Sequence, residues 1–101
     1  MITIDAREVG GIVDLVVSGE VDLDSAEVLQ DALQRVLSDG PPAIRVDLAG
    51  VSFLNSTGLR ALVAGATDAK HRGIRYSVVH PQRAVRRVLD IAGLTETLCV
   101  D

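Results

Sequence analysis

The sequence predicts an α/β fold in which helices pack against a mixed, mainly parallel β-sheet. Apolar runs rich in β-branched residues alternate with segments whose apolar side chains recur at helical spacing. Of the 101 residues, 48% are hydrophobic but only 2% are aromatic, so the core must be aliphatic, as buried strands under helices require. The expected order is strand, strand, helix, strand, helix, strand, helix, strand. We expect residues 1–101 to form a single domain.

A β-hairpin is expected at the N-terminus. In residues 2–8 apolar and polar side chains alternate, and Gly10-Gly11 then predicts a tight turn. Residues 12–17 form an almost continuous apolar run with many β-branched side chains. Such a run predicts a central strand that is buried on both faces.

The first helix is predicted after this hairpin. Asp24 precedes Glu27 by three residues, which resembles a capping box with Asp24 at the N-cap, and apolar residues follow at helical spacing. The helix should run to about Asp39, because Gly40 suits its C-terminal end and the two prolines that follow cannot continue it. Alternating apolar residues at 43–48 predict the next strand.

The C-terminal half of the chain continues this alternation. An apolar stripe predicts a second helix over residues 57–72, with basic residues in its last turn, where they favour the helix dipole. Residues 74–79 predict a strand, and a third helix should open at Pro81 and close at Gly93. Residues 98–100 are expected to form a short last strand. Because helices join the later strands, these should pair in parallel.

Composition and charge exclude several classes of function. The net charge of -4 provides no electrostatic footprint for nucleic acid or an anionic membrane. No segment resembles a secretion leader or a membrane span, which predicts a cytoplasmic protein. Cys99 is the only cysteine, so we expect a buried, reduced thiol rather than a disulfide or a thiolate metal cluster. We expect a monomer without a cofactor.

The strongest candidate site is the turn at residues 51–59, where an apolar strand ends and a helix begins. Ser56 is expected at the N-cap, with its hydroxyl near the surface and close to unpaired backbone N–H groups. A phosphate on that hydroxyl would meet the positive end of the helix dipole. Ser56 is therefore either a phosphorylation site or a simple cap. Thr57 is the secondary acceptor, because its hydroxyl points less freely outward.

An enzymatic role has little support. A nucleophilic serine needs a base within reach, and His71 and His80 are both expected away from Ser56. The sequence contains neither a hydrolase nucleophile elbow nor a Walker-type glycine run with lysine. We therefore expect a protein that is not an enzyme.

Three aspartates offer an alternative reading of the same region. Asp22, Asp24 and Asp47 lie on or near strands that could gather them close to Ser56, as a magnesium site would require. However, Asp24 is expected to cap a helix, and the three residues lack a recognisable ligand spacing. No metal site is therefore expected.

Residues 47–59 resemble the signature of STAS domains, specifically the bacterial anti-sigma factor antagonists. Residues 18–22 resemble the strand-end motif of this family and residues 85–94 its C-terminal helix, so the resemblance covers essentially the whole chain. It implies the STAS fold, and a serine that an anti-sigma factor with serine kinase activity phosphorylates. That serine is Ser56. Asn55 stands where antagonists usually carry aspartate, which keeps the size and turn preference but loses the charge.

The resemblance also implies how such a site works. The unphosphorylated antagonist binds the anti-sigma factor and frees the sigma factor, phosphorylation ends this binding, and a phosphatase restores it. The residues expected to bind the partner surround the start of the second helix: Asp22, Asp24, Asn55, Ser56, Thr57, Gly58 and Leu59. The alternative is a non-switching STAS scaffold subunit of a stress-signalling or lipid-transport complex, which uses the same turn for constant docking.

Overall fold

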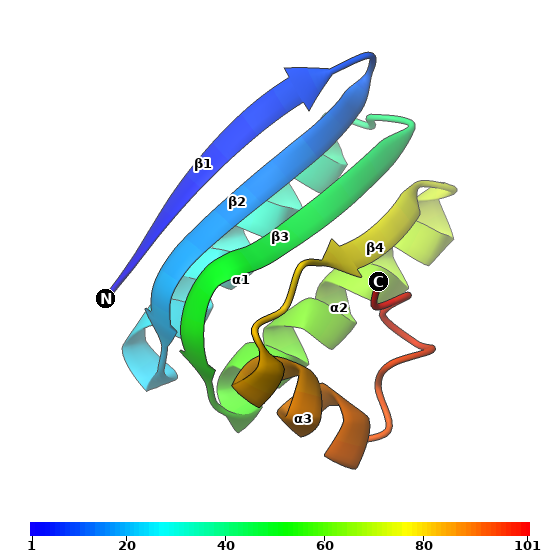
Figure 1. Cartoon of the computed structure of the whole chain (residues 1–101). Coiled ribbons are helices and arrows are strands. Elements are labelled where there is room, and N and C mark those ends of the chain that lie inside the picture. The colour runs from blue at the N-terminus through cyan, green and yellow to red at the C-terminus, as the bar shows by residue number, and fades with distance from the viewer.

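A four-stranded sheet and three helices make up the computed structural model, which describes residues 1–101 (Figure 1). In chain order the elements are β1 (Ile2–Val9), β2 (Ile12–Val21), α1 (Leu23–Ser38), β3 (Ala43–Leu54), α2 (Ser56–Arg72), β4 (Arg75–Val79) and α3 (Arg83–Ile91). The strands lie in the order β1-β2-β3-β4; β1 is antiparallel to β2, and the other pairs are parallel. The predicted α/β class and mixed, mainly parallel sheet are confirmed.

The expected hairpin joins β1 to β2. Val9 pairs with Ile12 across Gly10 and Gly11, whose φ angles are +60° and +83°. Both turn residues thus occupy the left-handed region, as a two-residue turn of type I′ requires, and glycine adopts it without steric cost. The turn fixes the register of the whole hairpin.

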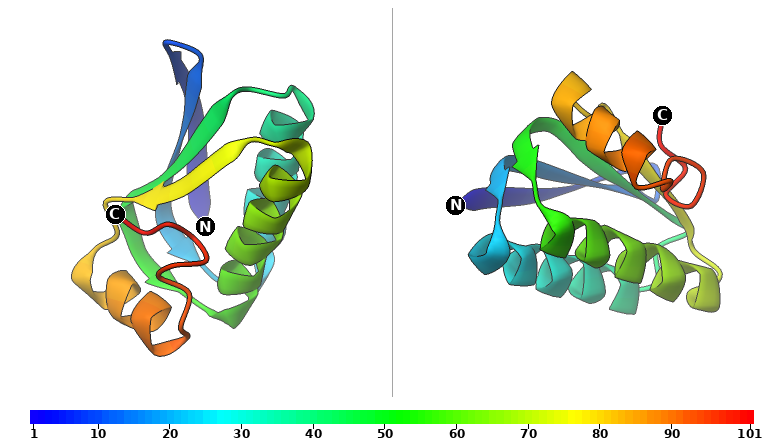
Figure 2. Two further views of the ribbon diagram at one scale, coloured as in Figure 1. Left: turned by 90° about the vertical axis from the view of Figure 1, so that its right-hand side faces the viewer. Right: turned by 90° about the horizontal axis from the view of Figure 1, so that it is seen from below.

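Helices α1 and α2 lie side by side on one face of the sheet (Figure 2). Alternate strand residues meet them and form the aliphatic core, which includes Leu15, Val17, Leu29, Leu33, Ile44, Val46, Leu48 and Leu62. The intervening residues of β2, such as Asp14 and Val16, are only half-buried. The expectation that β2 is buried on both faces is wrong, because both long helices cover the same face.

Strand β3 continues well beyond the end of β4. Pairing between the two strands stops at Asp47 and Val79, whereas β3 runs on to Leu54. Helix α3 lies past the end of β4, beside this second half of β3, and buries Val85 and Leu89 (Figure 1). The helix thereby covers a stretch of β3 that has β2 on one side but no strand on the side of β4.

The third helix begins after Pro81 rather than at it. Its first residue is Arg83 and its N-cap is Gln82, whose side chain makes no capping hydrogen bond. Instead, the Gln82 side-chain amide donates to the Ala49 carbonyl of β3 at 2.8 Å. This hydrogen bond secures the start of α3 to the sheet.

The C-terminal segment differs from the expectation in two respects. The predicted strand at residues 98–100 is reduced to a single bridge between Val78 and Val100. Cys99 is exposed, so the expected buried thiol is wrong; the neighbouring Leu98 takes the buried position instead. None of the three helices has the length and apolarity needed to span a bilayer.

Candidate functional site at the start of helix α2

Asn55, rather than Ser56, caps helix α2. Its backbone is extended, its side-chain oxygen accepts from the Gly58 N–H at 2.9 Å, and its carbonyl accepts from the Leu59 N–H at 3.0 Å. The expected N-cap at Ser56 is therefore wrong by one residue. Asparagine serves as well as serine at an N-cap, and the longer β3 delivers Asn55 to that position. Ser56 is the first helical residue and is exposed, and Thr57 is half-buried.

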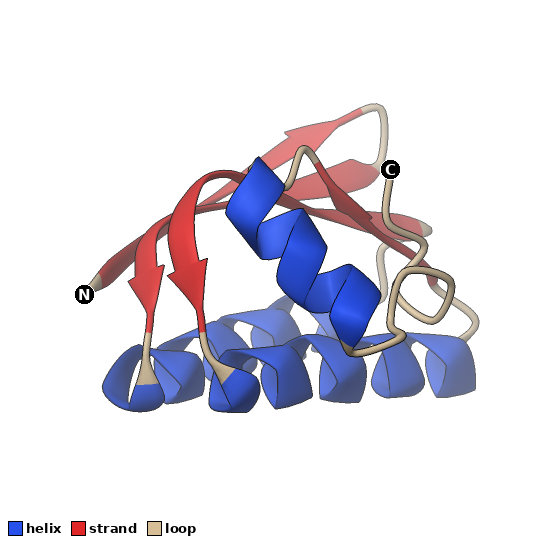
Figure 3. Ribbon diagram, turned by 60° about the horizontal axis from the view of Figure 1, so that its bottom comes forward, coloured by secondary structure: helices blue, strands red, loops and turns tan.

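The starts of α1 and α2 lie next to each other, where β2 and β3 end (Figure 3). Val21 pairs with Leu54 in the last step of the sheet, and the Asn55 N–H donates to the Val21 carbonyl at 3.1 Å. Val21 directly precedes Asp22, the N-cap of α1, and Asn55 is the N-cap of α2, so this hydrogen bond holds the two helix starts together. The two helix starts therefore form one continuous surface.

Asp22 caps α1 and closes a capping box with Ser25. The Ser25 N–H donates to Asp22 Oδ1 at 3.0 Å, and the Asp22 N–H donates to Ser25 Oγ at 2.9 Å. The Ser25 hydroxyl also donates to Asp22 Oδ1, at 2.6 Å. This hydrogen bond first, and the one from the Ser25 N–H second, lower the pKa of the Asp22 carboxyl below its usual value of 3.8. The expected capping box of Asp24 and Glu27 is wrong, and Asp24 lies exposed in the first turn.

Gly58 and Leu59 support the site from beneath. Gly58 is buried, and a Cβ atom there would lie 2.6 Å from Leu54 Cδ1 and 2.7 Å from Val21 Cγ1. Only glycine lets α2 start this close to the strand ends without displacing them. Leu59 is partly buried and packs against the core. Of the expected binding residues, these two position the surface, whereas Ser56 lies on it.

Two large apolar side chains are exposed close to the caps of α1 and α2. Phe53, which precedes the Asn55 cap by two residues, is 50% exposed, and Leu23, which follows the Asp22 cap, is 70% exposed. Sequence reasoning missed both. The available signal was their phase, because Phe53 falls between the core positions Val51 and Leu54 of β3. An exposed apolar pair beside a polar turn is typical of a binding surface.

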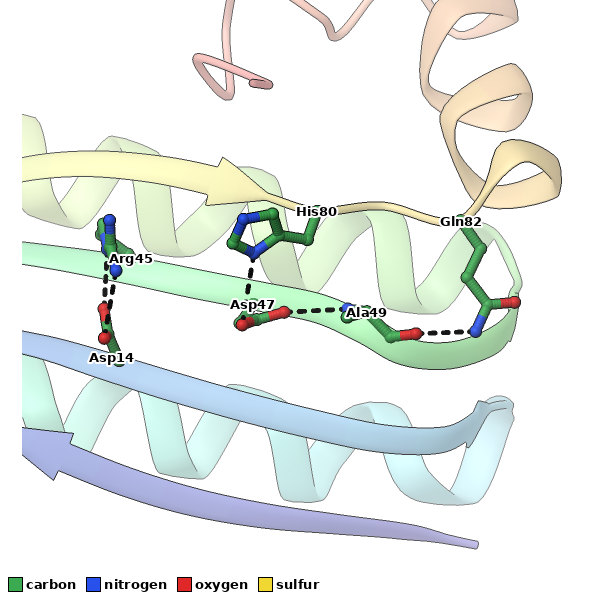
Figure 4. A network of polar contacts seen from close by, with 6 residues as sticks. All are labelled: Asp14, Arg45, Asp47, Ala49, His80 and Gln82. Carbon is green, nitrogen blue, oxygen red and sulfur yellow. Dashed lines mark hydrogen bonds and ion pairs between the residues drawn. The ribbon is translucent and has the colours of Figure 1, made fainter.

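Asp47 does not belong to this site. It lies on the open face of the sheet, where Oδ1 accepts from the Ala49 N–H at 2.9 Å and Oδ2 lies 3.4 Å from His80 Nδ1 (Figure 4). The suggestion that Asp22, Asp24 and Asp47 gather near Ser56 is therefore wrong. No group of three or more histidine, cysteine, aspartate or glutamate side chains is arranged to hold a metal ion.

The open face also carries an ion pair that spans two strands. Arg45 donates to both carboxylate oxygens of Asp14, at 2.7 and 3.1 Å (Figure 4). The hydrogen bond from Arg45 and the nearby positive charge lower the pKa of Asp14. This pair links β2 to β3 at a distance from Ser56. His71, the remaining histidine, lies exposed in the last turn of α2.

Comparison with known proteins identifies the family. Residues 4–100 match the family described as "Mlab, STAS domain". The chain belongs to the STAS domain family. This STAS domain is 33% identical, over 95% of its length and 78% of the relative, to the anti-sigma-F factor antagonist RsfB of Mycobacterium tuberculosis. It is 28% identical to an anti-sigma-B factor antagonist of Bacillus subtilis, covering 96% of the chain and 88% of the relative.

Solved structures support the same assignment. The crystal structure of an anti-sigma factor antagonist from Mycobacterium paratuberculosis has a TM-score of 0.87 and 33% sequence identity to this STAS domain. The match covers 99% of the chain and 85% of that structure. The expected STAS fold is confirmed, and so is the resemblance to the anti-sigma factor antagonists within the family.

Proposed function

We propose that this STAS domain is a cytoplasmic anti-sigma factor antagonist whose binding is switched off by phosphorylation of Ser56. The anti-sigma factor supplies the serine kinase activity and consumes ATP, and a phosphatase reverses the modification. The observation that carries the proposal is the exposed Ser56 side chain at the first position of α2, beside the start of α1. Relatives named as anti-sigma factor antagonists support it.

The capping geometry explains how a phosphate can act without unfolding the helix. Asn55 provides the cap through its own side chain, so the Ser56 hydroxyl is free for modification. A phosphate adds about -1.5 to -2 charges at pH 7 and lies near the positive end of the helix dipole, which stabilises it. The modification therefore changes the surface while the fold remains.

The surroundings of Ser56 explain why the phosphate would end binding. Phe53 and Leu23 are exposed close to the two caps, and a partner that covers both helix starts must exclude water from Ser56 as well. A small hydroxyl fits into such an interface, whereas a dianion with its hydration shell does not. Phosphorylation would therefore weaken binding because it raises the free energy needed to bury residue 56 in the interface. One copy of the chain contains the complete site.

The first test is phosphorylation. The purified protein is incubated with its cognate anti-sigma factor and ATP, and its intact mass is measured. We expect an increase of one phosphate that is lost in Ser56→Ala and retained in the matched variant Thr57→Ala. An unchanged mass, or an increase that persists in Ser56→Ala, would contradict the switch.

The second test is binding of the same anti-sigma factor. By calorimetry, Ser56→Asp should bind at least about 10-fold more weakly than Ser56→Ala, which corresponds to about 1.4 kcal/mol. Phe53→Ala should weaken binding without affecting the response to phosphorylation. If Ser56→Asp binds as well as the wild type, the turn serves constant docking, as in the scaffold alternative.

A further inference from the structure

The free edge of β1 is a second surface available for binding. β1 pairs with β2 on one side only and forms the outer edge of the sheet (Figure 1). The Met1 carbonyl accepts from the Glu20 N–H, so alternation along an antiparallel pair turns the N–H and C=O groups of Ile2, Ile4 and Ala6 toward the free edge. Such an edge is a template for another strand.

A groove that is mainly apolar at its centre runs beneath this edge, between β1 and the outer flank of α1. It consists of three adjoining cavities, which follow β1 from its start to its end. The first and the middle cavity share Val28, and the middle and the third share Ala6 and Val36. The middle cavity has a volume of about 450 Å³, and its apolar lining includes Ile4 and Ala32. Val28, Ala32 and Val36 are spaced by four residues, so they form one stripe of α1. Val28 is 53% exposed, because nothing in the chain covers this flank.

We propose that a second copy of this chain occupies the groove. The two β1 strands pair antiparallel about a twofold axis at Ile4, which extends the sheet across both copies. Beneath them, the two α1 helices pack antiparallel about the same axis at Ala32. The dimer replaces the monomer expected from the sequence, and it does not depend on the proposed switch at Ser56.

The midpoint of the β1 residues that line the groove lies level with the midpoint of the α1 stripe, so one twofold axis can pass through both. Ile2 and Val28 line the first cavity, and Ala6 and Val36 line the third. Four strand residues cover about 13 Å and eight helical residues about 12 Å, so Ile4 lies level with Ala32. One axis then pairs Ile2 with Ala6 of the partner subunit, and Val28 with Val36 of the partner subunit. The small Ala32 on the axis allows the helices to approach closely.

Charge complementarity favours a second copy over another occupant. Asp31 and Arg35 line the middle cavity, and neither forms an ion pair within the chain. In helices that cross antiparallel at Ala32, Arg35 of each copy lies about 3 Å along the helix from the level of Asp31 of the partner subunit, a distance that its long side chain spans, so the pair forms twice. If the two strands were instead centred at Asp5, this carboxylate would lie opposite Asp5 of the partner subunit. Repulsion between the two negative charges disfavours that register.

The antiparallel arrangement places the two Ser56 turns at opposite ends of the dimer. α1 begins beside the start of α2, where Ser56 lies, and the two α1 helices run in opposite directions about the axis. Each copy could therefore bind one anti-sigma factor without obstructing the other. An interface variant should dissociate the dimer and still bind its partner, which separates the two proposals.

Analytical ultracentrifugation over a range of concentrations tests the dimer. Ala32→Glu places two like charges on the axis, and we expect the dimer dissociation constant to rise about 100-fold or more. The matched control Gln30→Glu makes the same charge change on the opposite flank of α1, which lines the groove toward α2, and should leave the dimer intact. Circular dichroism confirms that both variants fold. A wild type that stays monomeric at every concentration, or an Ala32→Glu variant that still dimerises, would overturn the proposal.

A charge exchange tests the helix contact independently. Asp31→Arg should weaken the dimer, because each introduced arginine then lies close to Arg35 of the partner subunit. Adding Arg35→Asp restores opposite charges and should restore the dimer. If the double variant is no tighter than the single one, the helices do not meet in the proposed register.

Disulfide formation tests the strand register. Residues that form a hydrogen-bonded antiparallel pair have Cα atoms about 5.5 Å apart, within the range of a disulfide. In a Cys99→Ser background, which removes the exposed native thiol, Ile4→Cys should form a disulfide-linked dimer under mild oxidation. Glu8→Cys, on the same strand but away from the axis, should not. Equal cross-linking of the two variants, or none by Ile4→Cys, would contradict the register.

Discussion

Asn55 provides the hydrogen bond of a helix N-cap without the negative charge that aspartate would add. Its side-chain oxygen accepts from the Gly58 N–H, and aspartate would provide the same acceptor. Antagonists that carry aspartate at this position, as the family resemblance implies, add a negative charge at the positive end of the helix dipole. This chain retains the geometry of the turn and gives up the charge. The consequences for stability and for phosphorylation can therefore be measured separately.

Substitutions at Asn55 should separate the two contributions. Asn55→Ala removes the acceptor and should lower the free energy of unfolding by about 1 kcal/mol. Asn55→Asp retains the acceptor, and its charge should add about 0.3–1 kcal/mol through the helix dipole. Urea unfolding measures both values. An Asn55→Ala variant as stable as the wild type would show that the cap contributes nothing.

Gly58 is a second residue with a sharply defined role. In Gly58→Ala the new methyl group must displace Leu54 or Val21, both of which are buried. Overpacking of this kind costs about 1–3 kcal/mol, which should exceed the gain of about 1 kcal/mol from helix propensity. We expect a net loss of stability in urea unfolding. The adjacent exposed variant Ser56→Ala should change stability by less than about 0.5 kcal/mol, and a similar loss there would contradict this account.

The elements could be predicted in kind and order, whereas their ends could not. Period-two and helical apolar patterns are local properties, so the hairpin, the four strands of the sheet and the three helices follow from the sequence, whereas the strand expected at residues 98–100 is only a single bridge. The position of a cap depends on where the preceding strand stops pairing. β2 continues to Val21 and β3 to Leu54 because each extends the other's ladder, and this long-range pairing moves the caps to Asp22 and Asn55.

The capping box of α1 should make stability depend on acidic pH. The folded-state pKa of Asp22 lies below its usual value of 3.8, so its hydrogen bonds stabilise the fold above that pH, and the contribution is lost as the pH falls through the lower folded-state pKa. Asp22→Asn removes this titration. In thermal unfolding we expect wild type to lose stability more steeply than Asp22→Asn as the pH falls below about 4. Parallel curves for the two proteins would contradict the role of Asp22.

The arrangement of the whole molecule was only partly accessible from the sequence. Parallel pairing followed from the helical crossovers, and the family motifs implied the position of Ser56. Two features depend on the relative lengths of distant elements: the open face of the sheet, and α3 beside the second half of β3. Phe53 was missed for a different reason. Its position between the core residues Val51 and Leu54 was a local signal of exposure that the sequence reasoning did not use.

The hydrogen bond from the Asn55 N–H to the Val21 carbonyl makes one amide proton a reporter of the junction on which the proposed switch depends. Its exchange with solvent deuterium requires that the ends of β2 and β3 separate, so the exchange rate measures how often the two helix starts come apart. If phosphorylation acts through the surface alone, this rate should be the same before and after modification of Ser56. Faster exchange in the phosphorylated protein would show that the switch instead opens the junction between the two halves of the site.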